Sequence, residues 1–326
     1  MHRKTKVWAM LYVFFIFFWA GADAKEDTLA VLHISDIHIC NLTGYHPDFV
    51  KGRQHYGEGV PSFREFLDTV PRSMGADAVV ITGDLVDFYE AETEKGPTLG
   101  TQIEQLGPML THGPVPLFLT LGNHDLGSYW IEKNDRSIKS FQYHAHESRA
   151  AWIRNLPCFQ EGTYYARQFI VGKTTYRFLF LDNGYSLKND FLLDPSQLDW
   201  LYHQLQTAAD DPVILFMHKY LPVPDLNGDG KVFTEKSTFM INTETCSRGF
   251  LNALNGNKNV RALFVGHGHE SVSELLSFPA GHQILQTETA AFAKDRHNWR
   301  LLQFTENEII VHSTGERKIE LKQPVK

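Results

Sequence analysis

The chain has 326 residues, of which 43% are hydrophobic, and it carries a formal net charge of −7 at pH 7. That hydrophobic content is enough for one large domain with a well-buried core. The acidic charge argues against stable nucleic-acid binding. It does not exclude a nucleotide substrate, because bound metal ions can supply local positive charge.

The first 24 residues are expected to be a signal peptide. A basic start, Arg3 to Lys6, precedes an apolar run from Val7 to Ala20, and the small residues Ala22 and Ala24 follow. The run is shorter than the roughly 20 residues of a membrane-spanning helix, so we expect cleavage after Ala24 and no membrane span in the mature chain. Cleavage removes three basic residues and one acidic residue, which changes the net charge from −7 to about −9. The expected location is secreted or periplasmic, and an uncleaved N-terminal anchor is the alternative.

The mature chain, residues 25–326, is expected to form a single domain, because it contains no internal repeat, low-complexity run or obvious linker. Its three cysteines, Cys40, Cys158 and Cys246, lie far apart and include no C-x-x-C pair. Both one disulfide with a leftover thiol and three unpaired thiols are compatible with this spacing.

Short β-branched and apolar runs recur along the mature chain, and such runs are typical of buried strands. They cover residues 29–34, 78–82, 115–121, 176–181, 213–217, 262–265, 282–287 and 308–312. Helical patterns lie between several of them, at 62–74, 137–155 and 194–205, and the last begins with a capping Asp194 ahead of Pro195. Strands that alternate with helices predict an α/β architecture, with a more strand-rich final third.

Five of the expected strands are followed at once by a loop rich in Asp, His or Asn. The loops are Ser35-Asp36-Ile37-His38, Gly83-Asp84-Leu85-Val86-Asp87, Gly122-Asn123-His124-Asp125, Met217-His218-Lys219 and Gly266-His267-Gly268-His269. In open α/β sheets the loops beyond the carboxyl ends of the strands line the binding crevice, so these five loops are expected to converge. Each motif alone is more often a turn, but five of them in this order favour a shared metal site.

The residue types in these loops indicate which ions they hold. Carboxylate, carboxamide and imidazole groups without thiolates suit borderline ions, so we expect two divalent or trivalent ions of Mn, Fe or Zn. A pair of ions that cleaves a phosphoester lies roughly 3.5–4 Å apart and needs one ligand that reaches both, for which Asp84 is the natural bridge. Such a pair clamps the phosphate oxygens and lowers the pKa of a shared water toward about 7, which gives a metal-bridging hydroxide nucleophile.

These motifs, D-x-H, G-D, G-N-H-D, H and G-H-x-H, make the sequence similar to the calcineurin-like metallophosphoesterase superfamily from Asp36 through His269. The resemblance implies a four-layer α/β/β/α sandwich with two central mixed β-sheets. It implies two groups of metal ligands, one formed by Asp36, His38, Asp84 and His269 and the other by Asp84, Asn123, His218 and His267. It also implies that His124 is the general acid for the leaving oxygen and that Asp125 orients it.

Purple acid phosphatases resemble this superfamily but place a Tyr ligand three residues after the bridging Asp, where this chain has Asp87. They also lack the His of the first motif, which is present here as His38. A purple iron centre is therefore not expected. We expect Asp87 to orient a metal ligand or cap its loop rather than to bind metal.

The sequence thus predicts a secreted or periplasmic dinuclear metal-dependent hydrolase of small-molecule phosphoesters, with a nucleotide or a phosphodiester as substrate. We favour a phosphodiesterase. A phosphomonoesterase or nucleotidase on the same site is the alternative, and a catalytically silent metal-binding scaffold is a further one.

Three insertions between the motifs, Asn41 to Pro61, Asp125 to Ala150 and Leu221 to Gly249, are expected to form the substrate walls. Within and near them, ordinary packing or a solvated surface is the favoured interpretation of Tyr129, Trp130, His144, His146, Lys219 and Arg296. The segment Asp225–Gly230 resembles the first half of an EF-hand loop. Because Lys236 stands where the closing Glu is expected, we favour a hairpin turn over a calcium site.

Overall fold

The computed structural model describes residues 28–56, 59–184, 193–221 and 245–326, and side chains in the last range from Gly249 onward. The expected signal peptide and the segment Asp225–Gly230 lie outside the described residues. Among the helices that are described, none is long and apolar enough to cross a membrane.

The first central sheet has six strands in the order β16-β15-β14-β1-β2-β5. Their bounds are β1 (Thr28–Ile34), β2 (Ala78–Thr82), β5 (Leu117–Thr120), β14 (Arg300–Thr305), β15 (Glu308–His312) and β16 (Ile319–Pro324). Strands β1, β2 and β5 are parallel to one another, whereas β14 pairs antiparallel with β1. The carboxyl ends of the three parallel strands therefore meet at one edge of the sheet.

The second central sheet also has six strands, in the order β12-β13-β11-β10-β9-β8. Their bounds are β8 (Tyr165–Val171), β9 (Thr174–Phe180), β10 (Val213–Lys219), β11 (Val260–Gly266), β12 (Val272–Ser277) and β13 (Gln283–Glu288). The four inner strands are parallel, and the edge strands β8 and β12 run antiparallel to their neighbours. The expectation of two central mixed sheets is thus confirmed.

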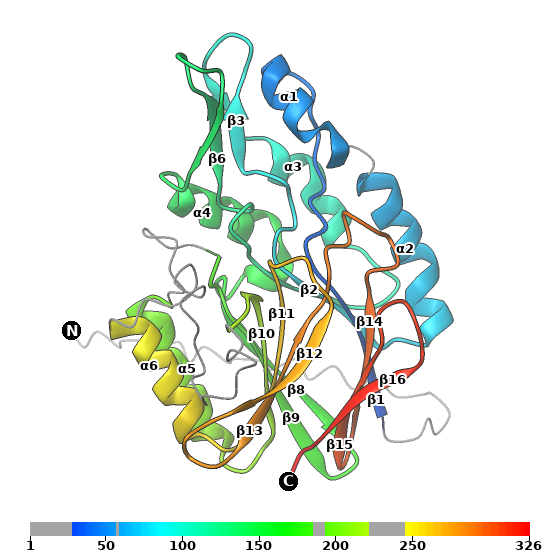
Figure 1. Ribbon diagram of the computed structural model, residues 1–326. Coiled ribbons are helices and arrows are strands. Elements are labelled where there is room, and N and C mark those ends of the chain that lie inside the picture. Colours follow the sequence, from blue (N-terminus) through cyan, green and yellow to red (C-terminus); the bar gives the residue numbers. More distant parts are fainter. Residues whose placement is uncertain (1–27, 57–58, 185–192, 222–244) are drawn as a thin grey trace, which may run out of the picture.

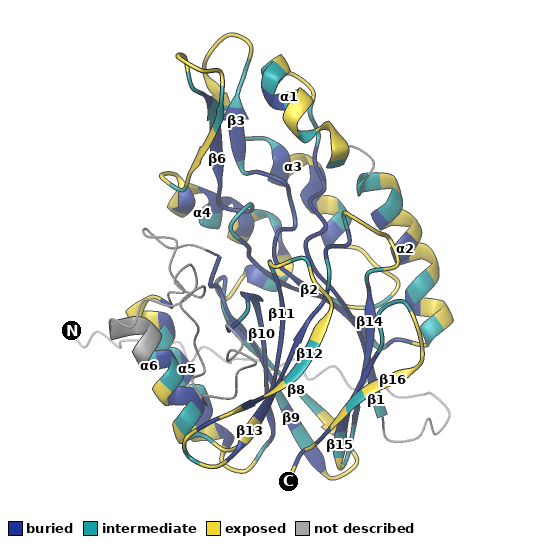
Figure 2. Cartoon of the chain, in the orientation of Figure 1, coloured by how far each residue is buried: buried dark blue, intermediate teal, exposed yellow. Residues whose placement is uncertain are grey.

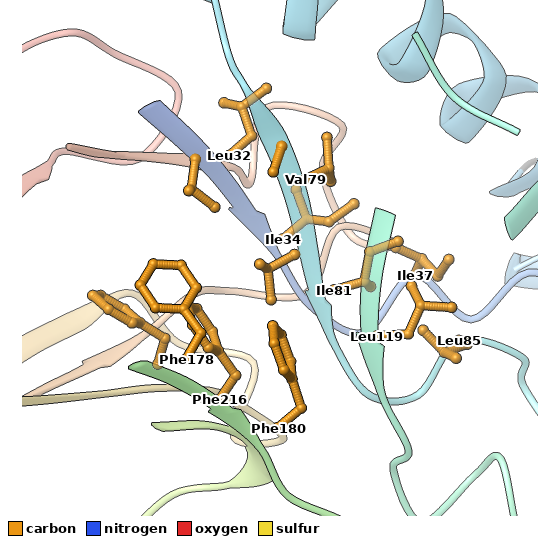
Figure 3. Close-up of a cluster of buried hydrophobic side chains, with 14 of the residues drawn as sticks. Leu32, Ile34, Ile37, Val79, Ile81, Leu85, Leu119, Phe178, Phe180 and Phe216 are labelled. Carbon is orange, nitrogen blue, oxygen red and sulfur yellow. The ribbon is translucent and has the colours of Figure 1, made fainter. Parts of the chain in front are cut away.

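The two sheets pack face to face through large apolar side chains. Phe178, Phe180 and Phe216 of the second sheet point toward Ile34 and Ile81 of the first (Figure 3). The residues that alternate with them, such as Leu179 and Leu215, point the other way and belong to a second apolar cluster. This period of two is what a strand buried on both faces requires.

Helices cover the sheets on their outer sides (Figure 1). On the second sheet, α5 (Pro195–Ala208) and α6 (Thr245–Gly256) bury Leu201, Leu205 and Phe250 in the second cluster. On the first, α2 (Gly59–Met74) buries Phe63 and Phe66 and leaves its other face exposed (Figure 2). The predicted cap of α5 is confirmed, since Oδ1 of Asp194 accepts a hydrogen bond from the amide of Gln197 at 2.9 Å.

A third, smaller sheet was not predicted. It has the order β4-β3-β6-β7, with bounds β3 (Glu90–Glu92), β4 (Thr98–Leu99), β6 (Ser128–Ile131) and β7 (Ile138–Phe141). It packs with α1 (Pro47–Arg53) around Phe49 and Phe88, and the two form a small lobe beside the carboxyl ends of the central strands (Figure 1). The remaining short helices are η1 (Gln54–Tyr56), α3 (Gln102–Leu106), η2 (Gly107–Leu110), α4 (Ala145–Asn155) and η3 (Pro157–Phe159).

The helix expected over 137–155 is wrong in its first part. Residues Ile138–Phe141 form β7, which pairs antiparallel with β6, and α4 begins only at Ala145. Pairing with β6, the preceding strand, satisfies the backbone of this segment, and that pairing outweighs its local helical pattern.

Candidate metal centre

The structure brings the five predicted loops together at the carboxyl ends of β1, β2, β5, β10 and β11. Ligand atoms of Asp36, His38 and His269 lie within 4.8 Å of one another. Ligand atoms of Asp84, His218 and His267 form a second group of the same size. The ends of these strands thus bring distant loops into hydrogen-bond contact, as with Asp36 and His267, which are 231 positions apart.

The carboxylate of Asp84 lies between the two groups. Its Oδ2 atom is 3.7 Å from Nε2 of His38 and 3.3 Å from Nε2 of His218. Nε2 of His218 is also 3.1 Å from Oδ1 of Asn123 and 3.1 Å from Nδ1 of His267. All seven residues expected to bind metal therefore lie in one cluster, with Asp84 in the central position.

Several ligand residues have a backbone conformation that side chains rarely adopt. Asp36, His38, Asp84, His267 and His269 have φ angles of 53°, 43°, 47°, 76° and 64°, and they are five of the seven non-glycine residues with positive φ in the described chain. Such strain persists only where the surroundings enforce it, and it gathers at functional sites. The fold therefore holds these loops in their strained conformation.

Glycines next to the ligands allow the loops to approach closely. A Cβ atom on Gly122 would fall on Oδ1 and the amide of Asp84, and one on Gly266 would fall on Oγ of Ser35 and Oδ2 of Asp36. The glycines of the third and fifth motifs are thus explained by space around the two carboxylates.

The buried charges of the cluster fit cations. Burial alone would raise the pKa of Asp84, but the imidazoles of His218 and His124 hold that pKa well below its usual range. Burial would likewise lower the pKa of His218, yet the carboxylates of Asp84 and Asp36 raise it to about 9. Burial and the neighbouring His218 lower the pKa of His267 to about 3. The buried site thus combines the ionised carboxylate of Asp84 with the neutral imidazole of His267.

One buried atom indicates directly that a cation fits. Nε2 of His38 is fully buried and makes no hydrogen bond with any described residue. It lies 3.9 Å from Oδ1 of Asp36 and 3.7 Å from Oδ2 of Asp84, too far for a hydrogen bond to either. A buried imidazole nitrogen with two carboxylate oxygens at this spacing is an orphaned group that a metal ion would satisfy.

The ring of His124 lies at the edge of the cluster. Its Nδ1 atom is 2.8 Å from the carbonyl oxygen of Asp87 and 3.0 Å from the hydroxyl of Tyr129. A carbonyl oxygen only accepts hydrogen bonds, so Nδ1 carries a proton. Nε2 is then the ring nitrogen that can contact a substrate. Burial lowers the pKa of this imidazole, and the charge of Asp84 opposes that effect.

The expectation that Asp125 orients His124 is wrong. Oδ1 of Asp125 accepts from the amide of Val86 at 2.9 Å, and Oδ2 accepts from the amide of Gly122 at 2.7 Å. Both oxygens are thus engaged with backbone, and the carboxyl braces the second and third loops against each other. The carbonyl of Asp87 contacts His124 instead.

As expected, Asp87 contacts a side chain that is predicted to bind metal. Its Oδ1 atom lies 3.1 Å from Nδ1 of His38. The same carboxylate pairs with Arg53, whose Nε donates to Oδ2 at 2.6 Å. The ring of Tyr56 stacks on His38 with centroids 4.6 Å apart and planes 13° apart.

Arg53 and Tyr56 were not found from the sequence, and their only signal was a position inside an insertion expected to line the site. Asn183 was missed as well. Its Oδ1 accepts from the amides of His218 and Lys219 at 2.9 and 3.1 Å, which fixes the end of β10.

Of the other expectations for single side chains, some are confirmed and others are wrong. Tyr129 contacts His124 rather than only packing, and Lys219 is buried rather than solvated. Arg296 is at the surface as expected, where it pairs with Glu65 at 2.9 Å. The remaining three, Trp130, His144 and His146, are not among the clustered ligand groups. Cys40 and Cys158 are free thiols, and the side chain of Cys246 lies outside the described residues.

Comparison with known proteins agrees with this geometry. Residues 29–271 match the family model for calcineurin-like phosphoesterase. A cAMP/cGMP dual specificity phosphodiesterase of Mycobacterium tuberculosis is 25% identical over 257 residues, which are 78% of this chain and 65% of that relative. The chain thus spans just under two thirds of the length of this curated relative.

Solved structures share the fold at low identity. A dimetal phosphatase from Danio rerio superposes with a TM-score of 0.57 at 15% identity, over 91% of this chain and 99% of that one. A purple acid phosphatase from yellow lupin seeds gives 0.53 at 11% identity, over 91% of this chain and 53% of that one. The family match covers most of the chain, and so the protein belongs to the calcineurin-like phosphoesterase family.

Proposed function

We propose that the protein hydrolyses small-molecule phosphodiesters at a dinuclear metal centre. The observation that carries this proposal is the central position of Asp84, whose Oδ2 atom lies near both His38 and His218. One carboxylate between two ligand groups is what a pair of neighbouring ions requires.

The ligands divide around that shared carboxylate. Asp36, His38 and His269 stand on one side of Asp84 and would hold the first ion. Asn123, His218 and His267 stand on the other side and would hold the second. The mixed oxygen and nitrogen donors suit Mn, Fe or Zn. When bound, the ions supply Lewis-acid contacts to the phosphate and lower the pKa of a water molecule.

The chain's own residues handle the proton of the leaving group. The imidazolium form of His124 keeps its Nδ1 proton on the carbonyl of Asp87 and donates its Nε2 proton to the departing oxygen, which leaves the neutral imidazole. The hydroxyl of Tyr129, 3.0 Å from Nδ1, holds the ring from the lobe side. Protonation of the alkoxide is worth roughly 10²–10⁴ in rate for a well-placed general acid.

The charge around the site favours a diester over a monoester. A phosphodiester carries one fewer negative charge than a monoester dianion and needs fewer cations from the protein. Arg53, the guanidinium beside His124, is paired with the buried carboxylate of Asp87, so the two side chains add little net charge. The similarity to a cAMP/cGMP phosphodiesterase supports the same ester class.

Export is part of the proposal and rests on the pattern of the first 24 residues. Expression of the full chain in a bacterium with a periplasm tests it. N-terminal sequencing of the periplasmic fraction is expected to begin at Lys25. Full-length protein retained in the membrane fraction would favour the uncleaved anchor instead.

The decisive experiment is hydrolysis by purified protein that has been stripped with a chelator and reloaded separately with Mn, Zn, Fe or Ni. The substrates are a nitrophenyl monoester and a bis-nitrophenyl diester. We expect two bound ions per chain, metal-restored activity, and a higher kcat/KM for the diester. A higher value for the monoester would favour a phosphomonoesterase or nucleotidase. Two bound ions without turnover of either ester would favour the silent scaffold.

A further inference from the structure

Three aromatic side chains form an ordered stack on the small lobe. The ring centroids of Trp130 and Phe141 are 4.1 Å apart with planes inclined by 8°. Those of Phe141 and Tyr143 are 5.0 Å apart with planes inclined by 4°. Tyr143 is 73% exposed and Phe141 is 39% exposed, so the stack ends in a ring that faces solvent.

The stack does not hold the lobe together. In the β6–β7 pair, the side chains that face the lobe's buried cluster are Tyr129, Ile131 and Ile138, which pack with Phe49 and Phe88. Trp130 and Phe141 alternate with these residues and stand on the opposite face. Rings kept parallel on a face that the lobe's own core does not use favour a ligand-binding role.

The stack lies beside the candidate metal centre. Gln142, between two of the stacked residues in the chain, directs its amide nitrogen to the carbonyl oxygens of Asn123 at 3.3 Å and Gly184 at 3.4 Å. The same hairpin reaches His124 through the hydroxyl of Tyr129. The stacked rings are therefore anchored next to the loop from which the leaving group receives its proton.

We propose that Trp130, Phe141 and Tyr143 form a platform on which a planar ring of the substrate stacks, and that the ring is a nucleobase. This inference rests on the proposed phosphoesterase function and names its substrate class. Lys139 lies directly opposite Trp130 on the same exposed face, and its charge suits an anionic nucleotide better than an apolar partner. Stacking does not read base edges, so the platform accepts purines and pyrimidines alike.

The test compares two diesters with the same nitrophenyl leaving group, the nitrophenyl ester of thymidine monophosphate and methyl nitrophenyl phosphate. Only the first carries a base. For Tyr143→Ala, the ratio of kcat/KM for the nucleoside ester to that for the methyl ester is expected to fall by about fivefold or more. Tyr143→Phe, which keeps the ring, is expected to retain the wild-type ratio.

Ile170→Ala is the matched control, because Ile170 is 79% exposed and lies at the hairpin end of β8, away from the carboxyl ends of the strands. It is expected to leave both kcat/KM values unchanged. An unchanged ratio in Tyr143→Ala would overturn the platform, and so would an equal loss on both esters, which would indicate a structural effect.

Failure of the proposed phosphodiesterase function is recognised separately, because the wild-type protein would then leave methyl nitrophenyl phosphate intact with every metal. In that event tryptophan fluorescence still tests the platform. Thymidine monophosphate is expected to quench wild-type emission more than ribose 5-phosphate does, and Tyr143→Ala is expected to weaken that binding. Equal response to the two compounds would overturn the inference.

Discussion

Nδ1 of His38 lies 3.1 Å from Oδ1 of Asp87, and this pair joins the first metal loop to the end of the second. The contact turns Nε2 of His38 toward Asp36 and Asp84. Arg53 from the lobe binds the same carboxylate. Asp87 therefore connects the lobe to His38, a proposed metal ligand, and is not itself a member of the clustered ligand groups.

Asp87→Asn is expected to weaken metal binding at the His38 side of the site by about 10–100-fold, because an amide holds the imidazole less firmly and donates no charge to it. Metal titration of the stripped protein, followed by calorimetry, measures the change. Asp48→Asn is the control, since Asp48 pairs with Arg136 at the surface of the lobe. Equal metal affinity in Asp87→Asn and the wild type would contradict the orienting role.

His218→Ala and His124→Ala are expected to fail in different ways. His218 lies in a group with Asp84 and His267, so its loss is expected to lower both the metal content and kcat. His124 also lies near His38 and Asp84, but its Nδ1 atom is engaged with the carbonyl of Asp87. His124→Ala is expected to keep two ions per chain and to lose about 10²–10⁴ in kcat, because only proton donation is removed. Elemental analysis beside kinetics separates the two cases, with His203→Ala on the exposed side of α5 as control. The same loss of metal in both variants would contradict this division of roles.

The ligand cluster could be predicted from the sequence because its geometry follows from the order and direction of the strands. Parallel strands end at one edge of a sheet, so any polar loop behind each strand arrives at the same place. Asp36 follows β1 of the first sheet and His267 follows β11 of the second, so they meet because the two sheets also pack face to face with these strand ends on the same side, although 231 positions separate them. The start of α5 could also be predicted, because the capping pattern at Asp194 involves only neighbouring residues.

The lobe could not be predicted from the sequence, because its strands are not marked by a pattern in their own residues. Strands such as β4 (Thr98–Leu99) are too short to show a period, and β7 depends on pairing with β6 rather than on its own residues. The role of Arg53 follows from where that lobe docks. The partners of Asp125 are backbone amides, and no pattern of side chains reveals which amides a carboxylate will meet.

Gly266→Ala tests whether close packing keeps the site in order. Its new Cβ would fall on Ser35 Oγ, which donates to the carbonyl of Thr82 at 2.8 Å, and on the carboxylate of Asp36. We expect a loss of about 1–3 kcal/mol in the free energy of unfolding, with weaker metal binding.

Gly256→Ala is the matched control for that change, because its Cβ meets no atom within 4 Å at the end of α6. A better helix former there is expected to leave the free energy of unfolding unchanged or to raise it by up to about 1 kcal/mol. Urea unfolding of both variants gives the comparison. If Gly266→Ala matched the control in stability and metal affinity, the steric explanation of the fifth motif would fail.

His33 provides a pH test of the core beneath the site. It is fully buried, with Nε2 2.9 Å from the hydroxyl of Thr82 and Nδ1 2.8 Å from that of Thr289. Burial, and then the positive charge of Arg300, lower its pKa from 6.5 to about 3. Between these values the unfolded chain binds a proton that the folded protein excludes. The stabilisation is therefore complete above pH 6.5 and is lost as the pH falls toward 3.

We therefore expect the free energy of unfolding, measured with urea in the presence of a chelator, to fall more steeply below pH 6.5 in the wild type than in His33→Gln. The difference in slope is expected to reach about 1.4 kcal/mol per pH unit, the value for one proton. His203→Gln removes an exposed histidine on α5 and is expected to run parallel to the wild type. All other titrating groups are common to the three proteins, so a His33→Gln curve that also ran parallel would mean that His33 is protonated within the fold.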